Sequence, residues 1–249
     1  MSLEHWVNLL DSVLQGGIRA DSPDLASSFA RFAIEWPNAR PAQVVDETIT
    51  LPTSRAEELG LLGYARAVMQ GPSAAALLPL EEPLPPGRLS ARMGRTVVRA
   101  AWLAVARQAA VGSVRRPAAI EALLQSHDGR TFLEFHNDDP PEAWWYDELV
   151  LLHAVTTCSV LSHDPQARRV AMASAGFCHR EIQPDHATGL PWALHAFVLN
   201  ADTHLFADWL VNACLVQYAG EPRGLALVLL ADALYCLKHV VRAGTSSGL

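Results

Sequence analysis

Leu152-His153-Ala154 and, 42 residues further along, Leu194-His195-Ala196 are two copies of a short repeated triplet. Each triplet opens a stretch rich in leucine and alanine. Each is followed by an aspartate that suits a helix start, and then by an apolar segment with a cysteine. A repeat of this length accommodates one helical hairpin. Because a single hairpin cannot bury its apolar face, such units stack. The repeat therefore predicts an all-α protein of stacked antiparallel helical hairpins, arranged as an open superhelix or a closed ring.

The composition predicts a folded chain that does not bind nucleic acid. Hydrophobic residues make up 50% of the 249 residues and charged residues 18%, as is typical of globular proteins. The formal net charge is -7. Because this charge opposes the phosphate backbone, we exclude nucleic acid as the main partner.

The sequence also predicts a cytoplasmic protein with no membrane span. The four cysteines show no CxxC spacing and lie in apolar patterns, as expected for free thiols in a reducing compartment. The N-terminus lacks the basic region and apolar run of a secretory signal. The longest apolar stretch, Leu225–Leu237, is too short to cross a bilayer and contains Asp232.

Helical signals run through almost the whole chain. Asp164-Pro165 is one of three acid–proline pairs that mark helix starts, because proline is tolerated at the first helical position. Ser54–Glu57 matches a capping box. Only Val44–Leu51 and Thr131–Phe135 resemble strands. The predicted helices cover residues 3–15, 23–36, 54–70, 95–111, 117–126, 142–162, 165–181, 190–200, 203–218 and 222–240.

One proline-rich run, Pro79–Gly87, is the clearest linker. We nevertheless predict a single helical domain over residues 1–249, since this length holds about six hairpin units. The alternative subdivision has an N-terminal helical part at 1–78, a Pro-rich linker at 79–94, a helical-hairpin core at 95–242 and a flexible tail at 243–249.

Four arginines follow spacings of four, three and four residues: Arg88, Arg92, Arg95 and Arg99. These spacings predict one face of a helix. Such a stripe is either a solvated surface or a binding surface for a phosphate group or a partner.

The paired-helix pattern of residues 95–240 resembles the α/α-toroid class, typified by terpenoid cyclases and the β-subunits of protein prenyltransferases. The resemblance implies inner and outer rings of helices, a central cavity that binds the ligand, and an apolar or isoprenoid-like substrate. Two motifs depart from the pattern. Gly176 stands where prenyltransferases carry an aspartate two residues before the zinc-binding cysteine. Asp138–Glu142 approaches the magnesium motif of terpene synthases but contains two prolines.

A dense polar cluster occupies residues 178–186, at the end of one predicted helix and in the connection after it. It contains the thiol, imidazole and carboxylate groups that zinc accepts. Zinc is therefore the candidate cofactor, with Cys178, His179, Asp185 and His186 as ligands. The alternative is a structural helix C-terminus, where His179 faces the negative end of the helix dipole.

The candidate catalytic residues are His153, Glu181 and His195. His153 and His195 occupy equivalent positions in the repeat, so two inner-ring helices would direct both imidazoles into one cavity. Glu181 is a carboxylate of the polar cluster. The alternative for each histidine is a hydrogen-bonded place in the core.

The sequence contains no Gly-rich phosphate loop, no Gly-x-Ser-x-Gly and no His-Glu-x-x-His. We therefore exclude classical NTPases, α/β-hydrolases and metalloproteases. The sequence favours a noncatalytic helical-repeat protein that binds a protein partner or a small ligand. The alternative is an α/α-toroid enzyme with a His/Asp/Glu-lined central cavity and zinc as its candidate cofactor.

Overall fold

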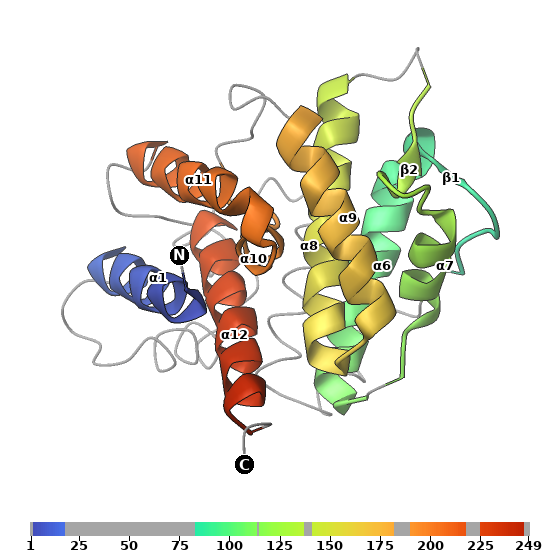
Figure 1. The fold of residues 1–249 in the computed structure, drawn as a ribbon. Coiled ribbons are helices and arrows are strands. Elements are labelled where there is room, and N and C mark those ends of the chain that lie inside the picture. The colour runs from blue at the N-terminus through green and yellow to red at the C-terminus, as the bar shows by residue number, and fades with distance from the viewer. Residues whose placement is uncertain are drawn as a thin grey trace, which may run out of the picture. The chain divides into compact units, whose positions relative to one another are not determined.

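The computed structural model describes residues 2–17, 83–113, 115–136, 141–181, 190–217 and 225–246, and over these residues the protein is all-α (Figure 1). Its two described strands are two residues long each, at Leu89–Ser90 (β1) and Leu133–Glu134 (β2). The described α-helices are Leu3–Gly17 (α1), Gly94–Val111 (α6), Ala118–Ser126 (α7), Pro141–Ser162 (α8), Pro165–Glu181 (α9), Leu194–Leu199 (α10), His204–Gln217 (α11) and Leu225–Ser246 (α12). Short 3-10 helices at Ala91–Met93 (η1) and Ala201–Thr203 (η3) precede α6 and α11.

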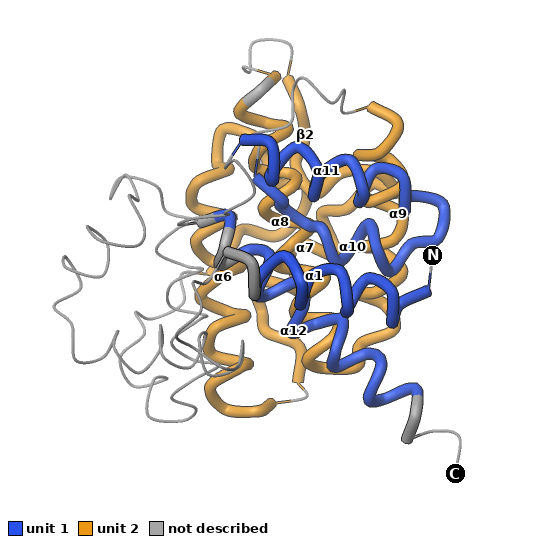
Figure 2. Tube along the Cα trace, turned by 90° about the vertical axis from the view of Figure 1, so that its left-hand side faces the viewer, with its two compact units in different colours: residues 1–52, 187–249 blue, residues 53–186 orange. Residues whose placement is uncertain are grey.

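The chain divides into two compact units (Figure 2). Unit 1 combines residues 1–52 with residues 187–249, and unit 2 consists of residues 53–186. The single-domain organisation expected from the sequence stays a prediction. β1 and η1 both lie within the range expected to be a linker.

Unit 2 is built around α8. The helices α6 and α9 both pack against α8 (Figure 1). The four consecutive residues Leu149–Leu152 are buried, which requires neighbours on every side of the helix. The helix α8 is therefore buried around its circumference in this stretch, and it forms the centre of the unit.

The strands β1 and β2 form a short parallel ladder in unit 2, which joins the segment before α6 to the segment after α7. Leu89 of β1 pairs with Leu133 of β2. The Arg88 guanidinium donates hydrogen bonds to the carbonyl oxygens of Thr131 at 2.7 Å and Leu133 at 3.0 Å. On α8, the buried Glu148 carboxylate accepts hydrogen bonds from the backbone N–H groups of Phe132 at 3.0 Å and Leu133 at 2.6 Å.

The expected helical stripe of four arginines is wrong. Arg88 precedes a strand, Arg92 lies in η1, and only Arg95 and Arg99 lie in α6. The physical reason is the ladder: Arg88 is held by the β2 segment, so its side chain is not part of a helix face.

Unit 1 packs α1 against α12. Trp6, Leu10 and Leu14 follow one another at intervals of four residues and are fully buried, which is the pattern of one apolar helix face. Lys238 of α12 donates a hydrogen bond to Asp11 of α1 at 2.8 Å. The short helix α10 packs against both α11 and α12.

Most predicted helices in the described residues agree with the structure within a few residues. The main differences are at α10 and α12. α10 is shorter than expected because the turn Leu190–Ala193 precedes it. α12 ends at Ser246 and not at 240, so its last turn extends into the range 243–249 that was expected to be a flexible tail. The repeat is also less regular than its triplets suggest. Leu194–Ala196 starts α10, whereas Leu152–Ala154 lies in the middle of α8 rather than at a helix start. The predictions at 23–36, 54–70 and Val44–Leu51 lie outside the described residues, and the arrangement as a repeat or toroid stays a prediction.

The prediction of buried thiols agrees with the structure. All four cysteines are buried, and none of them forms a disulfide. Among the described helices, none combines the length and apolar character needed to cross a bilayer.

Candidate functional site

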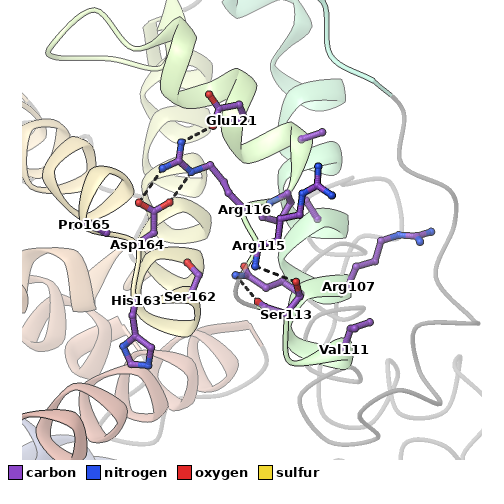
Figure 3. Close-up of a pocket in the computed structure, with 14 residues that line it drawn as sticks. Arg107, Val111, Ser113, Arg115, Arg116, Glu121, Ser162, His163, Asp164 and Pro165 are labelled. Carbon is purple, nitrogen blue, oxygen red and sulfur yellow. Dashed lines mark hydrogen bonds and ion pairs between the residues drawn. The ribbon is translucent and has the colours of Figure 1, made fainter.

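A pocket of about 950 Å³ opens in unit 2, between the end of α6, the loop before α7 and the turn from α8 to α9 (Figure 3). Three arginines line it, and we call it the arginine pocket after them: Arg107, Arg115 and Arg116. Glu121 and Asp164 are the carboxylates of the lining.

Local sequence explains why two adjacent arginines lie at this site. The helix α6 ends at Gly112, whose φ of 65° is left-handed, a conformation that glycine adopts without steric cost. The chain then runs as a short loop to Pro117, which starts α7. Arg115 and Arg116 lie on this loop, so their side chains reach the pocket from a connection between two helices (Figure 3).

Arg116 is held by two carboxylates. Its Nε donates to Asp164 Oδ2 at 2.6 Å and its Nη2 to Asp164 Oδ1 at 3.0 Å, which is a bidentate pair. Its Nη1 donates to Glu121, so the guanidinium lies between the two acids (Figure 3). The Arg116 hydrogen bond is the main cause that lowers the pKa of Asp164 and of Glu121. The same pairing raises the pKa of Arg116.

Asp164 also caps α9. Its Oδ1 accepts hydrogen bonds from the backbone N–H groups of Gln166 at 2.9 Å and Ala167 at 3.1 Å. This confirms the helix start that Asp164-Pro165 predicts. One carboxylate thus orders both the start of α9 and the Arg116 side chain.

Arg115 is placed differently from its neighbour. It is exposed, and its backbone N–H donates to Ser113 Oγ at 3.1 Å. Within the part of the chain that the structure describes, the Arg115 guanidinium has no hydrogen-bond or ion-pair partner. Relative to the described residues, it therefore presents a positive charge at the pocket that no acid neutralises.

Two neutral polar residues of the lining, Gln108 and Ser113, connect it to the buried Cys158. Cys158 donates its thiol hydrogen to Gln108 Oε1 at 2.9 Å, and Gln108 Nε2 donates to the Ser113 carbonyl at 3.2 Å. Burial raises the pKa of Cys158 to about 12. The thiol consequently stays protonated at neutral pH and is a poor nucleophile.

The zinc cluster expected from the sequence is only partly described. Cys178 is buried in α9, and burial raises the pKa of its thiol. His179 is half-buried on the same helix. Neither belongs to a group of three closely placed ligands among the described residues. Asp185 and His186 lie outside the described residues, so this metal site stays a prediction.

The candidate catalytic residues of unit 2 are not brought together. Glu181 is exposed at the last residue of α9. His153 is fully buried halfway along α8, where its ring centroid lies 5.4 Å from that of Trp102. The expectation that His153 shares a cavity with His195 stays a prediction.

His195 lies in unit 1 beside an acid that sequence reasoning did not assign to a site. Ligand atoms of His195 on α10 and Asp232 on α12 lie within 4.8 Å of each other, and both residues are buried. Imidazole and carboxylate are metal ligands, so this pair offers two coordinating groups. The signal in the sequence was an aspartate within the apolar stretch Leu225–Leu237.

The arginine pocket was also missed at the sequence level. Its signal is the adjacent pair Arg115-Arg116 followed by Pro117, between two predicted helices. Asp164, the carboxylate that pairs with Arg116, was predicted only as a helix cap.

Comparison of the chain with protein-family models, with curated proteins and with solved structures finds no match.

Proposed function

We propose that unit 2 is a noncatalytic binding module for a small anionic molecule, which binds in the arginine pocket. The observation that carries this proposal is the placement of Arg115. Its guanidinium lines a pocket of about 950 Å³ and has no partner among the described residues. A carboxylate or phosphate oxygen of a ligand is the natural partner of such a group.

The charge and size of the pocket support the same ligand class. Three arginines and two carboxylates line it, which leaves a positive excess in a chain of net charge -7. Its volume lies within the range of about 300–1,000 Å³ that is usual for small-molecule sites. Arg116 is held in place and neutralised by two carboxylates, so the positive excess comes from Arg107 and Arg115.

The ionisable groups around the pocket favour binding over catalysis. Asp164 and Glu121 have lowered pKa values, so they carry no proton to donate near neutral pH. The Cys158 thiol keeps its proton for the opposite reason, since burial raises its pKa. Both carboxylates are occupied by Arg116 and the thiol is protonated, so these groups stabilise the lining and supply no general acid.

Isothermal titration calorimetry tests the proposal with two oxyanion probes, citrate and inorganic pyrophosphate. We expect at least one probe to bind the wild-type protein, and Arg115→Ala to raise its Kd roughly tenfold or more. Arg130→Ala is the matched control, since Arg130 is an exposed arginine of unit 2 that does not line the pocket. The proposal is wrong if neither probe binds, or if Arg115→Ala and Arg130→Ala bind as the wild type does.

One observation favours a second candidate, the metal-dependent enzyme with a polar cavity. Burying a carboxylate and an imidazole is costly unless they pair or coordinate a metal. Asp232 and His195 are both buried in unit 1 with their ligand atoms within 4.8 Å. Metal analysis of the purified protein tests this candidate independently of the arginine pocket.

A further inference from the structure

An exposed proline-rich segment leads into β1. It covers Pro83–Gly87, which we call the proline segment, and its three prolines are all exposed. Leu84 and Pro85 each precede a proline, which restricts both residues to extended backbone, and the proline rings fix φ. These covalent restrictions favour the polyproline II conformation. With three residues per turn, that conformation places Pro83 and Pro86 on the same side.

The proline segment is available to a partner. Within the described residues, the carbonyl oxygens of Pro83–Pro86 accept no hydrogen bond. In Figure 1, the coil that leads into β1 projects from the helices of unit 2. Arg88, the residue after the segment, is fixed by its hydrogen bonds to Thr131 and Leu133, so the segment extends from a rigid base. A segment restricted in this way loses little conformational entropy when it binds.

Unit 2 also carries four aromatic rings that contact one another in sequence, and we call them the aromatic row. The ring centroids of Phe135 and Trp144 lie 4.7 Å apart, and those of Trp144 and Trp145 lie 4.5 Å apart. Those of Trp145 and Phe177 lie 5.8 Å apart. All four side chains are partly exposed, whereas Trp102 of the same unit is fully buried. The row is therefore a surface feature rather than part of the core.

Trp145 has a hydrogen-bond donor that the described residues do not use. Its neighbour Trp144 donates the indole N–H to the Leu133 carbonyl at 3.4 Å. The indole N–H of Trp145 has no such acceptor in the described part of the chain. A partly exposed indole of this kind suits a partner that offers both apolar surface and a carbonyl oxygen. A polyproline II segment offers both, and aromatic-lined surfaces bind such segments.

The ladder keeps the two features apart within one molecule. β1 and β2 are parallel; Gly87 precedes Leu89 of β1, and Phe135 follows the last residue of β2. The proline segment therefore leaves one end of the ladder, and the aromatic row begins beyond the other end. Consistent with this, the three prolines are exposed and not docked on the row of their own molecule. A second copy of the chain can supply the segment instead.

We propose that the protein forms a two-fold symmetric dimer in which the proline segment of each copy binds the aromatic row of the other. The two-fold arrangement makes both contacts at once, because each copy carries both features. Partly exposed rings offer roughly 50–80 Å² each, and the segments that cover them bury a similar area. The two contacts together bury on the order of 1,000 Å², at the lower end for specific complexes, so the dimer is weak, with a Kd of about 10–100 μM.

Sedimentation equilibrium over about 5–300 μM protein tests the dimer. We expect the wild type to associate with a Kd within this range. Trp145→Ala removes a ring and its donor, and a double variant with Pro83→Ala and Pro86→Ala removes the two prolines that share one side. Each should raise the Kd about tenfold or more. Pro165→Ala is the control, because it changes an exposed proline of unit 2 outside both features, and it should associate as the wild type does.

A mixture of the two variants distinguishes the proposed contact from a loss of folding. Trp145→Ala keeps an intact proline segment and the double proline variant keeps an intact aromatic row, so a mixed dimer retains one of the two contacts. We expect the equimolar mixture to associate more strongly than either variant alone. A mixture that associates no more than its components overturns the proposal, as do variants that associate like the wild type.

A wild type that stays monomeric over the whole concentration range also overturns it. Titration with a decaproline peptide then identifies the other occupant of the row. Binding of that peptide to a monomeric wild type, and its loss in Trp145→Ala, would assign the aromatic row to a proline-rich segment of another protein and not to a second copy.

Discussion

Asp164 accepts a bidentate pair of hydrogen bonds from Arg116, at 2.6 and 3.0 Å, although 48 residues separate the two in the sequence. The side chain of Asp164 is only 10% exposed and that of Arg116 22%. The pair joins the start of α7 to the turn between α8 and α9. It therefore sets the geometry of one wall of the arginine pocket.

Replacing Asp164 should separate its two roles. Asn is as good a helix cap as Asp but cannot form a charged pair, so Asp164→Asn should lower the free energy of unfolding by about 1–2 kcal/mol. Asp164→Ala also removes the cap and should cost about 1 kcal/mol more. Urea denaturation of both variants measures these differences. Equal stabilities of the two variants would show that the cap contributes nothing.

The stability of the wild-type protein should depend on Asp164 at acid pH. The pKa of Asp164 is lowered from 3.8 in the folded state, mainly by the Arg116 hydrogen bond. Below about pH 4 the unfolded chain takes up a proton that the folded protein does not, so unfolding becomes easier as the pH falls. The difference in the free energy of unfolding between the wild type and Asp164→Asn should therefore be largest near pH 7 and should decrease below pH 4. Thermal unfolding from pH 3 to pH 7 measures it, and a constant difference across that range would contradict the prediction.

Glu148 should make the free energy of unfolding depend on pH in the opposite direction. Burial raises its pKa from 4.5 to about 8, although two backbone N–H groups partly oppose the shift. Between these values the folded protein holds a proton that the unfolded chain has lost, so this group lowers stability as the pH rises, by up to about 1.4 kcal/mol per pH unit. Glu148→Gln removes this titration.

We expect the stability of Glu148→Gln to vary less between pH 5 and pH 8 than that of the wild type. The variant should be less stable at pH 5, because the amide NH₂ cannot accept the second backbone hydrogen bond. The measurement is the slope of the unfolding free energy against pH, which is independent of this offset. Parallel slopes for the two proteins would show that Glu148 does not titrate in this range.

The helices could be predicted because their signals are local. The bounds of α9 follow from the cap at Asp164 and from apolar spacing within the same segment. β1 could not be predicted in this way. Its backbone pairs with β2, and the Arg88 side chain bonds to Leu133, 45 residues away.

The candidate site is nonlocal in the same sense. The sequence showed a cap at Asp164 and two adjacent arginines at Arg115 and Arg116, but no pattern linked them. The link requires α6 and α9 to pack on α8, which places the loop before α7 beside the turn after α8. The left-handed backbone of His163, a residue of the arginine pocket, is likewise a property of the folded chain, since histidine itself does not signal a left-handed residue.

Metal content should depend on the buried pair in unit 1. We expect protein purified without chelators to contain about one equivalent of a transition metal such as zinc by elemental mass spectrometry, because His195 and Asp232 offer closely placed ligand atoms in a buried setting. His195→Ala and Asp232→Asn should each lose most of it, whereas the exposed His5→Ala in the same unit should retain it. His186→Ala, measured in parallel, separates this pair from the cluster predicted at residues 178–186. Loss of metal in His186→Ala alone would assign the ion to that cluster, and metal-free wild-type protein would contradict both metal sites.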